Sequence, residues 1–196
     1  SVNDTAVSST NGAGGEGRHM NGSAETIQGI AADGGLYPID KLEAHRIGAR
    51  HVAISAFVFA GDALLLQRRA LGKYHSGGQW ANSCCSHPAW NETPAACVRR
   101  RVREELGVDL LFTEVGTFDY EAEVGDDLIE HEAVHLFTAE VDRDALALRP
   151  DAEEVMEVRW MDPRLLRADA RRRPQRYTPW LRLYLDRAWP LIARAA

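Results

Sequence analysis

Reactive side chains gather in the segment Asn82-Ser83-Cys84-Cys85-Ser86-His87-Pro88. Residues two apart in an extended segment point to the same side, so we expect the Cys85 thiol and the His87 imidazole to face one site. A thiol there can act as a nucleophile or carry a proton, and an imidazole can bind a metal ion. Taken alone, the segment is better explained as a buried cysteine pair beside a structural histidine, because free cysteine is commonly buried.

A charged run follows in the next predicted helix, Arg100-Arg101-Val102-Arg103-Glu104-Glu105-Leu106-Gly107-Val108. It resembles the Nudix box, in which a glycine, a distant glutamate and a terminal Arg-Glu-apolar-x-Glu-Glu-x-Gly-apolar sequence hold Mg²⁺ against a diphosphate. Carboxylates suit this task because Mg²⁺ prefers oxygen ligands that it shares with substrate phosphates. The positions that fit are Glu92, Arg100, Glu104, Glu105 and Gly107. A solvated charged helix would explain a pair of glutamates, but not the helix cap, the spacing and the glycine together.

Two positions depart from that box. Ser86 stands where the glycine belongs, and Arg101 replaces the glutamate that follows the arginine. Arg101 and Glu105 are one helical turn apart and share a face. Glu105 can therefore hold a metal ion while Arg101 binds a phosphate directly. Such an arrangement suits holding a diphosphate intact better than activating water against it.

Two more carboxylates, Glu130 and Glu132, lie in a predicted strand. Alternation places both on one face with Val134 and places His131 on the other face. Acids on an edge strand are ordinarily exposed, but here three histidines with no other assignment, His45, His51 and His87, complete a site of three imidazoles and two carboxylates. This set exceeds the four ligands of a structural Zn²⁺ and suits an octahedral ion such as Mn²⁺ or Mg²⁺. Zn²⁺ can still occupy the site, since it binds imidazole more tightly than either.

The elements that must position these residues follow from apolar patterning and turn signals. The apolar runs His51–Phe59 and Ala63–Leu66 flank a Gly-Asp turn, which predicts a β-hairpin. A helix is expected from Thr93-Pro94 to Leu106, because threonine caps free amides, proline suits the first position and a glycine follows the last. The other expected elements are a surface loop over Ala70–Gln79, strands over Gly116–Glu123, Leu128–Val141 and Val155–Trp160, and a last helix that starts at Thr178-Pro179 and reaches Pro190. The predicted fold class is α/β, a mixed α/β sandwich with sheets flanked by helices.

Composition limits the partners and the compartment. The chain has 196 residues and a net charge of −6, so it has no general attraction to nucleic acid or to an anionic membrane, and we expect neither as a partner. A polyanionic ligand must be held by a local basic cluster. No apolar run approaches the roughly 20 residues of a membrane span, and no secretory signal is recognisable. Three cysteines favour a reducing, cytoplasmic location over a disulfide framework.

The N-terminal part of the chain differs in composition from the rest. Residues 1–35 are rich in Ser, Gly, Asn, Ala and Thr and have few large apolar side chains. Such a segment buries too little apolar surface to offset the cost of ordering. The sequence therefore predicts a disordered tail over residues 1–35 and one domain over residues 36–196.

The motifs together resemble type 1 isopentenyl diphosphate isomerase, which has a Nudix-like α/β fold. The resemblance runs from about Lys41 to Trp189 and includes the Asn82–Pro88 segment, the modified Nudix helix, the Glu-x-Glu strand and the Thr-Pro-Trp near the end, in the family's order. It implies interconversion of isopentenyl and dimethylallyl diphosphate, a small-molecule isoprenoid substrate, by protonation and deprotonation through a tertiary carbocation. Several independent motifs over about 150 residues are far more specific than a single match.

The resemblance also implies roles for individual residues. The catalytic thiol would be Cys85 and the opposing acid/base Glu132, with Tyr120 hydrogen-bonded beside it. Metal ligands would be His45, His51, His87, Glu130 and Glu132, with Glu105 holding a Mg²⁺ that bridges the diphosphate. The diphosphate would be bound by Lys41, Arg69, Lys73 and Arg101, and the isoprenoid end would be covered by Trp180. Cys84 has no implied catalytic role.

Two other functions compete with this one. A Nudix pyrophosphohydrolase needs the missing glycine and glutamate and has no use for Cys85. A non-catalytic metal- or diphosphate-binding module needs neither Cys85 nor Tyr120. The product formed from isopentenyl diphosphate, whether dimethylallyl diphosphate or free phosphate, separates these possibilities.

Overall fold

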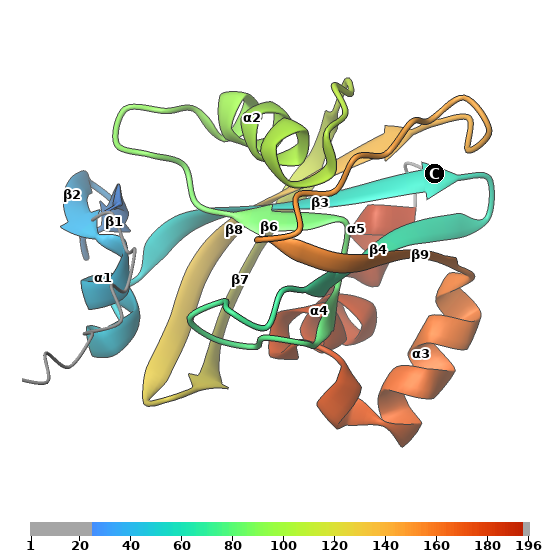
Figure 1. Cartoon of the computed structure of the whole chain (residues 1–196). Coiled ribbons are helices and arrows are strands. Elements are labelled where there is room, and N and C mark those ends of the chain that lie inside the picture. Colours follow the sequence, from blue (N-terminus) through green and yellow to red (C-terminus); the bar gives the residue numbers. More distant parts are fainter. Residues whose placement is uncertain (1–24, 194–196) are drawn as a thin grey trace, which may run out of the picture.

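Strand β3 is the centre of a mixed sheet in the computed structural model, which describes residues 25–193 (Figure 1). In those residues β3 pairs with β1 and β4, with the short β6 in antiparallel fashion and with β8 in parallel fashion. The strands are β1 (Thr26–Ile30), β2 (Leu36–Asp40), β3 (His51–Ala60), β4 (Ala63–Arg69), β5 (Trp80–Ala81), β6 (Cys84–Ser86), β7 (Thr113–Gly125), β8 (Leu128–Glu140) and β9 (Val155–Met161). The helices are α1 (Lys41–Ile47), α2 (Pro94–Leu106), α3 (Pro163–Arg172), α4 (Pro179–Leu183) and α5 (Trp189–Ala193).

The apolar sequence of β3 places it in the interior on both faces. Ala53 and Phe57 belong to a core shared with the C-terminal helices, whereas Ile54 and Val58 belong to a second core shared with α2. Figure 1 accordingly shows α2 over one face of the sheet and α3 and α4 on the other side. A strand buried on both faces reads as a continuous apolar run, which is what residues 51–59 show.

The predicted α/β sandwich and most of its elements are confirmed. The β3–β4 hairpin, the loop after β4 and the strands β7 to β9 lie where the patterning placed them. In α2 the Thr93 side chain accepts a hydrogen bond from the amide of Ala96, and Gly107 closes the helix at a φ of 71°. These local signals position the two residues that share the helix face, Arg101 and Glu105.

The predicted boundary of the tail at residue 35 is wrong at its C-terminal side. Residues 26–30 form β1, which pairs with β2, and the Ile27 side chain is buried. The Gln28 side chain donates to the carbonyl oxygens of Ala89 and Glu92, both at 2.7 Å, and so ties β1 to the segment before α2. These contacts outweigh the weak local composition. Residues 1–24 of the predicted tail and 194–196 of the predicted domain lie outside the described residues.

The last helix begins as predicted, with the Thr178 hydroxyl capping the amide of Leu181. It passes through a π-helical turn, η2 (Tyr184–Ala188), before α5. Pro190 has no amide proton for the carbonyl four residues earlier, so the regular helical bonding is interrupted there. The segment packs Trp180 and Tyr184 into the core beside the sheet. Of the helices in residues 25–193, none combines the length and apolar character that crossing a bilayer requires.

Candidate active site

One pocket collects every predicted catalytic and substrate-binding side chain. Its lining comes from α1, the end of β4, the loop after β4, β6, α2, β7, β8 and α4. The predicted residues among the lining are Lys41, Arg69, Lys73, Cys85, His87, Arg101, Tyr120, Glu130, Glu132 and Trp180. The sequence motifs therefore converge in space, although they are far apart along the chain.

The β3–β6 pairing sets the environment of the two adjacent cysteines. Cys85 pairs with Ser55, and its sulfur lies 3.2 Å from the Ser55 hydroxyl and donates to Asn82 Oδ1 at 3.0 Å. Ser55 in turn lies 2.8 Å from the Tyr184 hydroxyl. Burial raises the pKa of Cys85 to about 12, so the group is a neutral thiol near neutral pH. Cys84 turns to the opposite side, into the core beneath α2, as alternation along a strand requires.

The β7–β8 hairpin joins the predicted carboxylates to Tyr120. Tyr120 is the cross-strand partner of Glu132, and its hydroxyl oxygen lies 2.9 Å from Glu132 Oε2 and 2.7 Å from Glu130 Oε2. Both glutamates are buried, and burial together with the charge of Glu132 raises the pKa of Glu130 well above its usual value. A phenol has one proton, so it cannot serve both carboxylates at once. The proton of a neutral Glu130 carboxyl can be donated to the Tyr120 oxygen, so that the contact between these two groups is also a hydrogen bond.

Burial alone would raise the pKa of Glu132, but neighbouring imidazoles lower it well below its usual value. His51 is the parallel register partner of Glu132, with 3.5 Å between Nε2 and Oε1. The His87 Nε2 lies 2.8 Å from the same oxygen. The two carboxylates of this strand face are therefore inequivalent: Glu132 is held as the anion beside imidazoles, and Glu130 favours the neutral acid.

Hydrogen bonds to backbone carbonyl groups fix the orientation of two of the imidazoles. Nδ1 of His45 lies 2.7 Å from the Lys41 carbonyl oxygen, and Nδ1 of His51 lies 2.7 Å from that of Ala49. A carbonyl only accepts, so each Nδ1 carries a proton, which leaves Nε2 as the ring atom that could bind a metal ion. Burial lowers the pKa of His45 to about 4, which keeps it neutral. Among the described residues the buried Nε2 of His51 has no hydrogen-bond partner, an arrangement that suits a metal ion.

Two groups of side chains in the described residues could hold a metal ion. One contains His45, His51, His87 and Glu132, with all ligand atoms within 4.8 Å of one another. The other contains His45, His75 and Glu130, so His45 joins the two groups. All five side chains predicted for this centre are thus brought together. Glu105 belongs to neither group; it accepts from Gln67 at 2.8 Å and from Arg101 at 2.7 Å on the side of α2.

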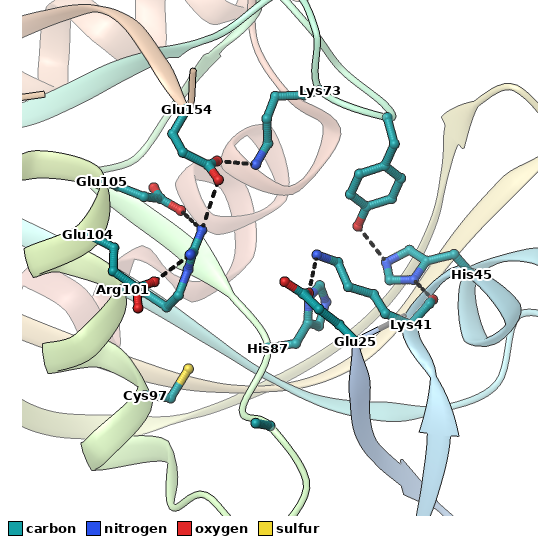
Figure 2. A network of polar contacts seen from close by, with 12 residues as sticks. Glu25, Lys41, His45, Lys73, His87, Cys97, Arg101, Glu104, Glu105 and Glu154 are labelled. Carbon is teal, nitrogen blue, oxygen red and sulfur yellow. Dashed lines mark hydrogen bonds and ion pairs between the residues drawn. The ribbon is translucent and has the colours of Figure 1, made fainter. Parts of the chain in front are cut away.

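The predicted diphosphate-binding cations each lie beside a carboxylate or an aromatic ring, and Figure 2 shows Lys41, Lys73 and Arg101 with their partners. Lys41 pairs with Glu25 at 2.7 Å, and Lys73 pairs with Glu154. Arg101 contacts the carboxylates of Glu104, Glu105 and Glu154 at 2.6, 2.7 and 3.5 Å. The Arg69 guanidinium lies over the Trp180 ring, 5.1 Å from its centroid. Two lysines and two arginines thus gather at one pocket of an acidic protein, each beside a carboxylate or an aromatic ring.

Sequence reasoning missed several residues of the site. Ser55 could have been found, because it is a polar residue inside an otherwise apolar strand. Tyr184 could have been found as well, because it lies one turn after Trp180 on a predicted helix. His75 and Glu154 carry no such signal: the first lies in a glycine-rich loop and the second follows a polar stretch before β9.

Comparison with known proteins finds relatives in the same family that the sequence motifs resemble. The NUDIX domain family matches residues 49–181. The isopentenyl-diphosphate Delta-isomerase of Dinoroseobacter shibae is 54% identical over 154 residues, which cover 78% of this chain and 87% of the relative. That of Cereibacter sphaeroides is also 54% identical, with 78% and 86% covered, and that of Rhodobacter capsulatus is 47% identical, with 86% and 96% covered.

Solved structures agree on the fold. A crystallised protein of Deinococcus radiodurans superposes with a TM-score of 0.68 at 15% identity, covering 83% of this chain and 98% of that protein. A MutT protein of Methanosarcina mazei gives a TM-score of 0.58 at 15% identity, with 74% and 95% covered. The relatives at about half identity agree with the two departures from the Nudix box and with the thiol that shares a pocket with the Glu-x-Glu face. The chain belongs to the isopentenyl-diphosphate Delta-isomerase family of Nudix-fold proteins.

Proposed function

We propose that this pocket interconverts isopentenyl and dimethylallyl diphosphate, with Cys85 and Glu132 as its two acid/base groups. The observation that carries the proposal is that a neutral thiol and an ionised carboxylate line the same pocket. They come from β6 and β8, which pair with opposite edges of β3. Moving a double bond by one carbon needs one group that gives a proton and another that takes one.

The proton balance of this reaction closes without a redox cofactor or a covalent intermediate. A proton added to the terminal methylene carbon leaves a positive charge on the tertiary carbon. Removal of a proton from the neighbouring methylene, on the diphosphate side, forms the new double bond. The protonation states support Cys85 as the thiol that donates the proton to the methylene carbon and Glu132 as the carboxylate that removes the other proton. In the reverse direction the two groups exchange roles.

Aromatic side chains suit the cationic intermediate. Trp180 is buried and lines the pocket, and an indole face stabilises a nearby positive charge through its π electrons. Tyr74 and Tyr120 add further aromatic rings to the lining of the pocket. Tyr120 also orients Glu132 through its hydroxyl, which makes it a positioning residue for that carboxylate.

The cations at the pocket support binding of the diphosphate. Lys41, Arg69, Lys73 and Arg101 all line the pocket, and guanidinium groups bind phosphate oxygens in a forked geometry. Glu105 is proposed to hold a Mg²⁺ ion that the diphosphate shares. Its contact with Arg101 would bring the metal and the arginine to the same phosphate group.

The imidazole–carboxylate cluster is proposed to hold one Mn²⁺, Mg²⁺ or Zn²⁺ ion. His45, His51, His87, Glu130 and Glu132 would be its ligands, as the fixed Nδ1 protons and the unpartnered Nε2 of His51 among the described residues support. A bound divalent ion supplies positive charge that favours the carboxylate form of its ligands. Small-molecule substrate binding and a cytoplasmic location remain part of the proposal.

A product assay tests the function directly. Purified protein is incubated with isopentenyl diphosphate, Mg²⁺ and Mn²⁺ in D₂O, and the products are read by NMR and by phosphate release. We expect dimethylallyl diphosphate that contains deuterium in a methyl group, no free phosphate, and no turnover by Cys85→Ala. Phosphate release without isomerisation would establish a hydrolase, and neither product would establish a binding module.

A further inference from the structure

His75 is a buried imidazole to which neither the motifs nor the proposed acid/base pair give a role. It lies in the loop over Ala70–Gln79, which composition predicts to be a surface loop, yet only 4% of its surface is exposed. Its neighbours in the loop, Lys73 and Tyr74, both face the pocket. The loop thus sends three consecutive side chains inward.

The loop holds the His75 ring in a defined position. Arg69 Nη2 donates to the His75 carbonyl oxygen at 3.2 Å, and the Ser76 hydroxyl lies 3.2 Å from His75 Nδ1. Ser76 has a φ of 53°, a left-handed conformation that is strained for a residue with a side chain. The edge of the imidazole packs against the Trp180 ring, with the centroids 5.6 Å apart at 90°. Backbone strain, hydrogen bonds and packing therefore all fix this side chain.

The other ring nitrogen faces the metal-capable cluster. His75 Nε2 lies 3.3 Å from Glu130 Oε1, and the His75 and His45 ring centroids are 5.9 Å apart. The Tyr74 hydroxyl lies 3.4 Å from Nε2 of the same His45. A histidine that binds a metal through one nitrogen commonly donates its other N–H to a nearby oxygen, and the Ser76 hydroxyl is placed to accept it. The geometry is that of a ligand with its supporting partner.

We propose that His75 is a further protein ligand of the metal ion held by the His/Glu cluster, which ties the loop over residues 70–79 to that ion. The inference rests on the proposed metal centre, but not on the isomerase activity. It raises the side chains available to one ion to six, namely His45, His51, His75, His87, Glu130 and Glu132. Six donors match an octahedral ion, and a fourth imidazole shifts the preference of the site toward metals such as Co²⁺ and Zn²⁺. Because Lys73 precedes His75 by two residues, the same bond would hold a diphosphate-binding cation in place.

Ligand counting tests the proposal without any substitution. The full chain is stripped with a chelator and reloaded with Co²⁺, and the solvent-exchangeable N–H signals of ligated imidazoles are counted by paramagnetic NMR after histidine labelling. Four shifted N–H signals at one bound ion per chain are expected. Three signals, or two bound ions per chain, would overturn the proposal.

A variant provides the second measurement. His75→Phe keeps an aromatic ring against Trp180 but removes both nitrogens, and we expect at least about 10-fold weaker Mn²⁺ binding in calorimetry, the scale of disturbed metal sites. His135→Phe is the matched control, since it removes an imidazole that is paired with Glu114 away from the cluster, and it should bind Mn²⁺ like the wild type. Wild-type affinity in His75→Phe would overturn the proposal. If the wild-type chain gives four imidazole signals but does not isomerise isopentenyl diphosphate, the result counts against the proposed function and leaves this proposal standing.

Discussion

The Cys85 thiol should react with iodoacetamide much more slowly than an ordinary cysteine, and the rate should keep rising with pH. Burial raises its pKa from 9.0 to about 12, and only the thiolate is nucleophilic. At pH 8 this difference reduces the thiolate fraction roughly 1,000-fold. Alkylation is followed from pH 7 to 10, with the modified residue located by tandem mass spectrometry. We expect about a tenfold rise in rate per pH unit and no plateau, because every step of pH increases a very small thiolate population.

Substitution completes the test of a proton-carrying thiol. Cys85→Ser keeps groups that can bond Ser55 and Asn82 but is a far weaker acid, so kcat should fall by roughly 10²–10⁴, the usual contribution of a positioned acid or base. Cys84→Ala is the control and should keep most of the activity, since Cys84 faces the core under α2. A plateau in alkylation near pH 7, or equal losses in the two variants, would refute the reasoning and indicate a thiolate nucleophile or a structural pair.

Three further predictions concern the diphosphate, the metal and the N-terminus. Arg101→Glu should weaken pyrophosphate binding in calorimetry by about 1.5–3 kcal/mol, the value of a charge-assisted bond, without creating hydrolase activity, and unchanged affinity would mean that this arginine binds no phosphate. Glu130→Gln should regain part of its turnover in excess Mn²⁺, whereas Glu132→Gln should stay inactive at any metal concentration because an amide does not exchange a proton near neutral pH; metal rescue of the latter would leave it a ligand only. Deletion of residues 1–24 should leave the melting temperature nearly unchanged, but deletion of residues 1–35 should lower it by several degrees because it removes a strand with a buried isoleucine; equal melting temperatures would contradict the packing of β1.

Local signals were sufficient where the structure depends on near neighbours. The limits of α2 follow from Thr93 and Gly107, whose conformations are fixed by their own side chains or the lack of one. The shared face of Glu130 and Glu132 follows from strand alternation, which has a period of two in every sheet. Each of these predictions needs only the sequence within about one turn or one strand.

Distant pairing was not predictable in the same way. The parallel register of β3 and β8 sets His51 against Glu132, and nothing in either strand alone specifies which residues meet. β1 and α1 are short, at 5 and 7 residues, and owe their stability to packing against the rest of the domain. His75 is placed by strained loop backbone, which composition describes only as polar and glycine-rich.

The carboxylates beside the pocket cations change what an incoming anion encounters. Lys41 and Lys73 are each paired with a glutamate, and Arg101 with three. A diphosphate that binds there exchanges places with anions that belong to the protein itself, instead of releasing counter-ions from the solvent. The tethered carboxylates remain close by and compete for the same cations at every turnover. Ion exchange of this kind would make diphosphate binding less sensitive to ionic strength than binding to unpaired cations.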